Sequence, residues 1–259
     1  MAFNRWILLA VLAAAWTMLP GRQASAELSG TDIMTRVDQR EVGADMSSEV
    51  TMRLVSKGGE ERVRKLKMLS KGKSNTKKVL IHFLEPADVR GVGFLVWRHP
   101  GKDDDRWLYL PDLHMVRRIA AADKRGSFVG SDFVYEDIAG RDVDQDQHTL
   151  TGSESIGGKD CYVVKSVPLD SKSAEFEHKV SWIRKDNFVV VKEMYYDHQG
   201  NPLKKLTIDI LEKVQEIWTM RKQTMLNLQT GHYTVVTWDK VKYNTSLGEE
   251  VFTERYLSR

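Results

Sequence analysis

The sequence of 259 residues has a single cysteine, Cys161, so the chain cannot form an internal disulfide. Because Cys161 lies in the apolar run 161–164, we expect a buried structural thiol ahead of a reactive one. After residue 26, no apolar run approaches the roughly 20 residues that a membrane-spanning helix needs. The 39 basic and 36 acidic residues are interleaved, which argues against a concentrated basic face for nucleic acid.

Motifs of the common enzyme classes are also missing. The chain has no Gly-x-Ser-x-Gly, His-Glu-x-x-His or Walker A sequence, and Gly91-Val92-Gly93 lacks the third glycine of a dinucleotide fingerprint at Val96. The seven histidines are scattered, with no pair at metal-ligand spacing on a helix. Asp103-Asp104-Asp105 is compatible with weak calcium binding, although a solvated turn is favoured. We therefore expect a protein without catalytic activity, metal or cofactor.

The N-terminus has the features of a secretory signal peptide. Arg5 provides the positive charge of a short n-region, and an apolar run follows over residues 6–19. Ala24-Ser25-Ala26 matches the small-x-small pattern, which predicts cleavage after Ala26. Cleavage removes two arginines and no acidic residue, so the formal net charge falls from +3 to +1. The sequence thus predicts export of a mature chain that starts at Glu27.

The mature chain predicts one helix followed by many strands. A helical pattern capped by Thr31-Asp32 is expected to end near Gly43. From Ser47 the apolar period changes to two, the period of strands. Residues 120–141 do not alternate cleanly and predict a loop with short helices, and residues 249–257 predict a C-terminal helix. About eleven strands with short turns and no linker indicate one mainly β (α+β) domain, residues 27–259, built on an antiparallel meander.

One predicted strand is apolar on both faces. Over residues 188–196, Val189 and Val191 face one side, and Val190 and Met194 face the other. Such a strand must be covered on both sides. Two explanations stay open: the terminal helices and the irregular middle section cover the second face, or the inner face lines a cavity for an apolar ligand.

Several motifs occur together in an order that resembles a known family. These are residues 83–94 (FLEPADVRGVGF), 107–111 (WLYLP), 116–119 (VRRI) and 131–138 (SDFVYEDI). With the N-terminal helix and the long meander, they are similar to the outer-membrane lipoprotein-sorting proteins, a branch of the LolA/LolB-like superfamily. The resemblance covers nearly all of the mature chain.

The resemblance implies a half-open antiparallel β-barrel, in which a curved sheet surrounds an apolar cavity and short helices form a lid. It also implies a monomeric periplasmic carrier that binds a lipid or lipoprotein acyl chain, contacts membranes transiently and moves its cargo between them. Members of this branch are associated with resistance-nodulation-division (RND) type lipid exporters, so an inner-membrane exporter is an expected partner. The identity of the lipid stays open.

Large side chains of the predicted strands are candidates for the cavity lining, although each by itself is more often an ordinary core residue. The candidates are Phe94, Leu95, Val96, Trp97, Trp107, Tyr109, Trp182, Met194 and Trp218. Burying one methylene is worth about 0.8 kcal/mol, so a 16-carbon chain gains on the order of 10 kcal/mol in such a pocket. The pocket must match that gain without greatly exceeding it, because cargo must also leave.

The segment 131–138 is the candidate lid. Phe133, Tyr135 and Ile138 are expected to close the cavity. Its acidic residues would hold it through hydrogen bonds or ion pairs, with two arginines as candidate partners; these residues are Asp132, Glu136, Asp137, Arg117 and Arg118. The competing explanation is that Ser131 and Asp132 only cap a helical turn.

A second class of function also fits the sequence. The chain is compatible with a non-catalytic envelope scaffold or accessory protein that docks a membrane transporter through a sheet edge or the C-terminal helix. A carrier should have a deep apolar cavity and copurify with lipid. A scaffold should have a filled core and an exposed apolar patch.

Overall fold

The computed structural model describes residues 27–259, which form one antiparallel sheet of thirteen strands. The strands are β1 (Asp45–Val55), β2 (Glu61–Lys71), β3 (Lys78–Glu85), β4 (Gly93–Trp97), β5 (Asp105–Leu110), β6 (Met115–Arg118), β7 (Asp146–Ile156), β8 (Lys159–Pro168), β9 (His178–Arg184), β10 (Val190–Tyr196), β11 (Pro202–Val214), β12 (Ile217–Asn227) and β13 (Tyr233–Tyr243). The helices are α1 (Gly30–Gln39), α2 (Tyr135–Ala139) and α3 (Glu254–Leu257), with 3-10 turns η1 (Ser74–Thr76), η2 (Pro111–Leu113), η3 (Ala121–Arg125), η4 (Val143–Gln145) and η5 (Glu249–Phe252). The predicted signal peptide lies outside the described residues.

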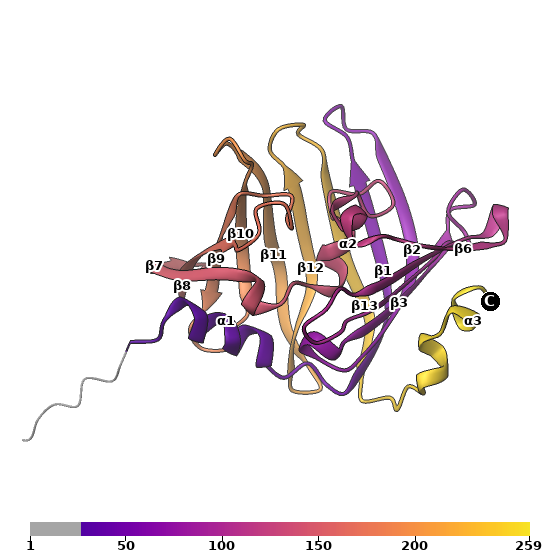
Figure 1. The fold of residues 1–259 in the computed structure, drawn as a ribbon, viewed down its shortest axis with the longest axis horizontal. Helices are drawn as coiled ribbons and strands as arrows, with labels where there is room; N and C mark the ends of the chain where they lie inside the picture. The colour runs from indigo at the N-terminus through magenta and orange to yellow at the C-terminus, as the bar shows by residue number, and fades with distance from the viewer. Residues whose placement is uncertain (1–26) are drawn as a thin grey trace, which may run out of the picture.

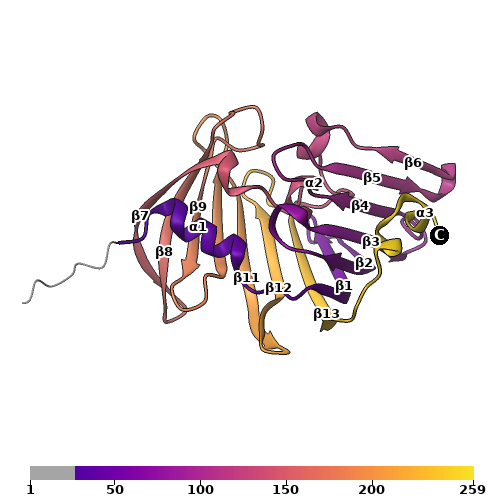
Figure 2. The same ribbon diagram turned by 60° about the horizontal axis from the view of Figure 1, so that its bottom comes forward.

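The strand order is β6-β5-β4-β3-β2-β1-β13-β12-β11-β10-β9-β8-β7, so β1 pairs with β13 in the middle of the sheet and β6 and β7 are its edges. The sheet curves into a half-open barrel (Figures 1 and 2). This architecture confirms the predicted fold class. The strands number thirteen where about eleven were expected, and β6 escaped prediction because it is short and mostly exposed.

Alternation along the strands creates two faces. In β1, Val50, Met52 and Leu54 are buried, whereas Glu49 and Arg53, at alternating positions, are exposed. We call the face that carries Val50 the inner face. The opposite, outer face carries α3.

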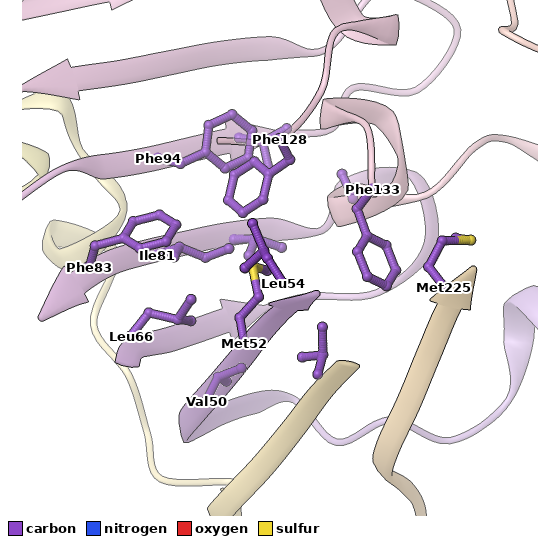
Figure 3. Packing of buried hydrophobic residues seen from close by; sticks show 14 of the residues in the cluster. Val50, Met52, Leu54, Leu66, Ile81, Phe83, Phe94, Phe128, Phe133 and Met225 are labelled. Carbon is purple, nitrogen blue, oxygen red and sulfur yellow. The ribbon is translucent and has the colours of Figure 1, made fainter. Parts of the chain in front are cut away.

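The inner face is covered by the irregular middle section, residues 120–141, which we call the covering segment. Its Phe128 is fully buried and places its ring centroid 6.0 Å from that of Phe83, 5.3 Å from that of Phe94 and 5.7 Å from that of Tyr135. Figure 3 shows the rings of Phe94 and Phe128 above Ile81 and Met52. The prediction of a loop with short helices over this section is confirmed by η3 and α2.

Helix α1 covers the inner face near the β7 edge of the sheet. A capping box starts it: the Asp32 amide donates to the Ser29 hydroxyl (3.1 Å), and the Ser29 amide donates to the Asp32 carboxylate (3.0 Å). Ile33 is fully buried against Val164 of β8 and Ile183 of β9. The cap therefore lies two residues before the predicted one, and the helix ends at Gln39 rather than near Gly43.

The C-terminal segment covers the outer face. The single helix predicted over 249–257 is divided into η5 and α3, because Thr253 has extended backbone and caps α3 by accepting a hydrogen bond from the Tyr256 amide (3.2 Å). Phe252 and Leu257 are fully buried in a cluster with Leu80 and Leu95. Cys161 is also fully buried, as predicted from its apolar surroundings.

Candidate ligand-binding site

Two adjoining cavities lie between the inner face and the covering segment. The large cavity has a volume of about 270 Å³ and is bordered by α1, the covering segment and strands β9 to β12. The small cavity has a volume of about 80 Å³ and is bordered by β1, β2, β3, β12, β13 and the covering segment. Phe133, Asp137 and Gln223 line both cavities, so the Phe133 ring stands at their boundary.

The large cavity has an apolar part made mainly by the sheet. Its apolar lining residues are Val37, Phe133, Phe176, Val189, Val190, Leu206, Ile208, Met220 and Met225. They come from α1, the covering segment, the loop before β9, and strands β10, β11 and β12. This part provides the hydrocarbon-like surface that an acyl chain requires.

A buried ion pair lines the same cavity. Lys179 Nζ lies 2.9 Å from the Glu193 carboxylate, which also accepts hydrogen bonds from the Ser181 hydroxyl (2.8 Å) and the Tyr195 hydroxyl (2.5 Å). Burial alone would raise the pKa of Glu193, but Lys179 and these hydrogen bonds outweigh it and hold the pKa below its ordinary value. Burial, together with Glu193, raises the pKa of Tyr195 well above its ordinary value, so Tyr195 remains a neutral donor.

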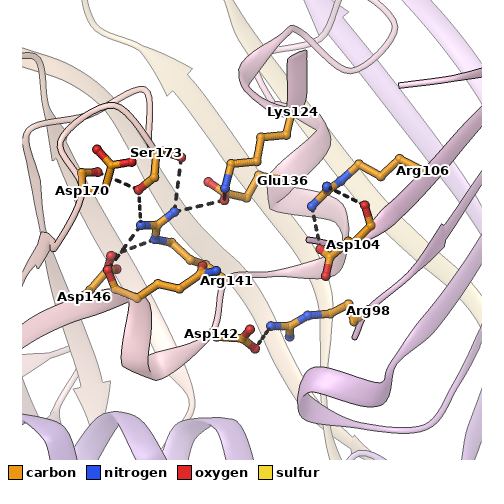
Figure 4. A network of polar contacts seen from close by, with 11 residues as sticks. Arg98, Asp104, Arg106, Lys124, Glu136, Arg141, Asp142, Asp146, Asp170 and Ser173 are labelled. Carbon is orange, nitrogen blue, oxygen red and sulfur yellow. Dashed lines mark hydrogen bonds and ion pairs between the residues drawn. The ribbon is translucent and has the colours of Figure 1, made fainter. Parts of the chain in front are cut away.

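Further ion pairs tie the covering segment to the sheet. Asp137 pairs with Lys204 of β11 at 3.1 Å, and Lys204 also contacts Glu175. Within the covering segment itself, Glu136 pairs with Lys124 at 2.7 Å and with Arg141 at 3.1 Å. Figure 4 shows Arg141 at the centre of the second group.

Arg141 extends that group toward the β7 edge. Its guanidinium lies 2.7 Å from the carboxylate of Asp146 and donates to the Ser173 hydroxyl at 2.7 Å. All these side chains are mostly buried, and each charge has a partner. The covering segment is therefore held in a fixed position over the cavities.

The structure places two of the three predicted lid residues, Phe133 and Ile138, at the cavities. Phe133 lines both of them, Ile138 lines the small one, and Tyr135 packs against Phe94 with ring centroids 5.4 Å apart. Asp132 accepts hydrogen bonds from His232 (2.7 Å) and from the Thr234 hydroxyl (2.7 Å). Asp132 thus joins the covering segment to β13 and its preceding turn.

The acidic lid residues have other partners than the two arginines expected from the sequence. Arg118 pairs with Asp105 of β5, and within residues 27–259 Arg117 forms no ion pair. Because β6 is an edge strand, both arginines lie beside β5 rather than at the covering segment's acidic residues. The partners are Lys124, Arg141, Lys204 and His232.

The predicted lining residues divide between the two faces of the sheet. Phe94 and Val96 lie on the inner face, in the packed cluster beneath Phe128, and border neither cavity. The others border neither cavity. Leu95, Trp97, Trp107 and Tyr109 lie on the outer face in the cluster with Phe252, and Trp182 and Met194 lie on the outer face at strand positions next to the inner-face residues Ser181 and Glu193. Trp218 lies two residues before Met220, which lines the large cavity, but does not line it itself. Choosing candidates by side-chain size did not distinguish residues of the inner face from residues of the outer face.

Sequence reasoning missed the polar lining and the contribution of β11 and β12. Leu206 and Ile208 follow a clear alternation in β11 and line the large cavity. Lys179, Glu193 and Lys204 occupy inner-face positions, where the register of β9, β10 and β11 brings them together. A charged residue at an inward position of a strand was the available signal, but the pairing of strands distant in sequence was needed to interpret it.

Other kinds of site find no support in the described residues. Within residues 27–259, no group of three or more His, Cys, Asp or Glu side chains is arranged to hold a metal ion. No helix in the same range is long and apolar enough to cross a membrane.

A curved sheet with a cavity beneath a covering segment defines a protein of LolA-like fold, and comparisons agree. A family model described as an uncharacterized protein matches residues 75–259. A DUF1329 family protein from Desulfovibrio piger is 35% identical over 88% of this chain and 97% of that chain, with a TM-score of 0.82. A putative outer membrane lipoprotein-sorting protein domain from Vibrio parahaemolyticus is 30% identical over 89% of this chain and 98% of that chain, with a TM-score of 0.83.

A LolA superfamily protein from Nitrosomonas europaea shares the fold, with 21% identity, a TM-score of 0.70 and coverage of 89% of this chain and 100% of that chain. A search of curated protein sequences finds no match. The chain belongs to the same family as the DUF1329 protein and the putative outer membrane lipoprotein-sorting protein domain, and it has the LolA-like fold.

Proposed function

We propose that the protein is a carrier that binds a lipid or a lipoprotein acyl chain between its sheet and its covering segment. The supporting observation is the pair of cavities that adjoin at Phe133. Apolar side chains border both, and ion pairs hold the covering segment above them. Such a site can bury hydrocarbon without a fixed polar recognition pattern.

Cavity size indicates how loading would proceed. The large cavity, at about 270 Å³, lies just below the range of roughly 300–1,000 Å³ that is usual for ligand pockets. A long acyl chain would therefore need Phe133 to move aside, which would join the large and small cavities. In this proposal the described arrangement is the closed one, and Phe133 is the gate.

The proposal extends to the cell. Residues 1–26 would direct export and be removed after Ala26, and residues 27–259 would act as one domain in the periplasm. There the monomeric carrier would contact membranes transiently and exchange cargo with an inner-membrane RND-type exporter, without catalysis. The name of the Vibrio parahaemolyticus relative supports this proposal, since it describes a lipoprotein-sorting domain.

Native mass spectrometry of the protein extracted from the periplasm is the direct test. We expect a mass increment that matches a lipid and disappears after extraction with organic solvent. A protein that carries no lipid, and that takes none up from vesicles, would overturn the carrier proposal in favour of a docking scaffold.

The gate is tested by Phe133→Asp. A charge at the boundary of the two cavities should weaken binding of a fluorescent fatty acid at least tenfold, because an ionised carboxylate strongly disfavours an adjacent hydrocarbon chain. The matched control is Leu169→Asp, at a side chain that is 71% exposed and lies outside both cavities. Equal binding by both folded variants would contradict the role of Phe133.

A further inference from the structure

One charged residue of the large cavity differs from all the others. Of the charged side chains that line it, Glu136, Asp137, Arg141, Lys179 and Glu193 each form an ion pair. Within residues 27–259, the remaining one forms none: this is Arg40, which directly follows α1. Its guanidinium donates one hydrogen bond, to the backbone oxygen of Trp218 at 3.3 Å.

Arg40 therefore has unused donors beside an apolar cavity. A guanidinium carries five N–H donors in a planar fork that matches a carboxylate or a phosphate. The lining also contains the apolar side chains of Val37, Ile208 and Met220. Arg40 is partly buried, and this burial lowers the pKa of its guanidinium.

A second cation without an ion-pair partner lies on the inner face. Lys77 precedes β3 and, by alternation with Val79 and Ile81, faces the same side as these core residues. Among residues 27–259 no carboxylate forms an ion pair with Lys77. Burial first, and then the charges of Arg98 and Arg40, lower the pKa of Lys77 to about 8.

The cation next to Lys77 already has a partner: Arg98 is hydrogen-bonded through its amide to the Lys77 carbonyl (2.9 Å), but its own charge is matched by Asp142. Arg40, directly after α1, and Lys77, directly before β3, remain as two cations that form no ion pair within residues 27–259. Like charges without a counterion oppose folding, so an arrangement of this kind is improved by any anion that binds there.

We propose that Arg40 and Lys77 bind the anionic headgroup, a carboxylate or a phosphate, of a lipid whose acyl chain occupies the large cavity. This inference rests on the proposed function and narrows its cargo. It assigns an anionic amphiphile, with the head at the α1 end of the cavity and the chain directed along Ile208 and Leu206 toward Phe133. An acyl chain without a charged head would leave the two cations unmatched.

Binding of three lipids with the same chain length tests the assignment. The probes are palmitate, palmitoyl lysophosphatidic acid and neutral hexadecanol, measured by isothermal titration with the mature protein. A charge-assisted hydrogen bond is worth about 1.5–3 kcal/mol, so at least one anionic lipid should bind about tenfold or more tightly than hexadecanol. Preference for palmitate or for the phosphate would identify the headgroup, and either supports the proposal.

Single variants test which residues produce the preference for anionic lipids. Arg40→Gln and Lys77→Gln should each lose most of the preference for the anion while binding hexadecanol as before, and Arg40→Lys should retain part of it. The matched controls are Arg36→Gln, on the same helix beside Phe188, and Lys73→Gln, an exposed residue near Lys77; both should retain the preference. Circular dichroism checks that every variant is folded.

The outcomes separate this inference from the proposed function. Wild-type protein that binds hexadecanol as tightly as the anionic lipids would overturn the anion site and leave the carrier intact, as would an unchanged preference in Arg40→Gln. Failure to bind any of the three lipids would overturn the carrier proposal itself. Inorganic phosphate that binds as tightly as the lysophosphatidic acid would show that the cations serve a free anion and would overturn the assignment to a lipid.

Discussion

The two halves of the sheet use their inner faces differently. In the half made by β1 to β6, aromatic rings from the strands and the covering segment interlock around Phe128, and only the small cavity of about 80 Å³ remains beside them. In the half made by β9 to β12, paired charges such as Lys179 and Glu193 occupy the inner face, and the larger cavity lies beside them. Apolar side chains can shift to fill a void, whereas an ion pair loses its partner if it moves. The comparison suggests that the charged half keeps the cavity open and the aromatic half supplies stability.

The largest effect is expected from Phe128→Ala in the aromatic half. Phe128 is fully buried and contacts three other rings, so the free energy of unfolding should fall by about 3–5 kcal/mol. Urea unfolding measures this loss. A loss below about 1 kcal/mol would show that this half is not the well-packed one.

In the charged half, Glu193→Leu should lower the free energy of unfolding by about 3 kcal/mol, because Lys179 is left buried without its partner. The expected loss is at the low end of the range for buried ion pairs, because Lys179 borders the large cavity and water that enters the cavity can solvate its charge. The double variant with Lys179→Leu should be more stable than the single one. A double variant that is less stable than Glu193→Leu would mean that the ion pair does not act as a unit.

Lys77→Met should instead stabilise the protein. The pKa of Lys77 in the folded protein is about 8, below its ordinary 10.5, so its charge is disfavoured in the folded state. Allowing for partial exposure, its removal should raise the free energy of unfolding by about 1–2 kcal/mol at pH 7.

The pH dependence checks the sign of this effect. Between pH 8 and pH 10.5 the unfolded chain binds more protons at Lys77 than the folded one, so wild-type stability should rise with pH in that window relative to Lys77→Met. Chemical unfolding at pH 7 and pH 10 measures the difference. If the difference in free energy of unfolding between Lys77→Met and the wild type does not narrow at pH 10, the lowered pKa of Lys77 is contradicted.

The smallest effect is expected from Asp132→Asn, which weakens the link between the covering segment and β13. The loss of charge-assisted hydrogen bonds from His232 and Thr234 should cost about 1 kcal/mol or slightly more. Hydrogen exchange of amides near Phe133 should accelerate, while amides of the β4 core should not. Uniform acceleration would indicate that Asp132 supports the whole fold rather than the covering segment.

The sequence predicted the sheet well and the site only in part. Alternation in β1 and in Leu206-Thr207-Ile208 is a local property, so strands and turns could be found from the chain itself. Which side of β4 or β9 faces the covering segment depends on pairing with distant strands, so Phe94 and Trp97 could not be separated by inspection. The covering segment was located correctly because it breaks the alternation.

The charged residues were the least predictable. Lys204 lies opposite Asp137 only because β11 passes below α2, and Arg40 reaches the cavity because α1 ends early, at Gln39. Neither relation has a sequence pattern of its own. Buried charges are recognisable only after their partners, or the lack of them, can be counted.

The pairing of β1 with β13 makes the two halves of the sheet depend on one seam. Met46 lies opposite Tyr243, and residues that meet across this seam are roughly 200 positions apart in the chain. Each half can assemble from hairpins of neighbouring strands, but joining them must wait until the last strand, β13, has been made. We therefore expect the seam to form late, and until it does the inner face is exposed to chaperones and proteases.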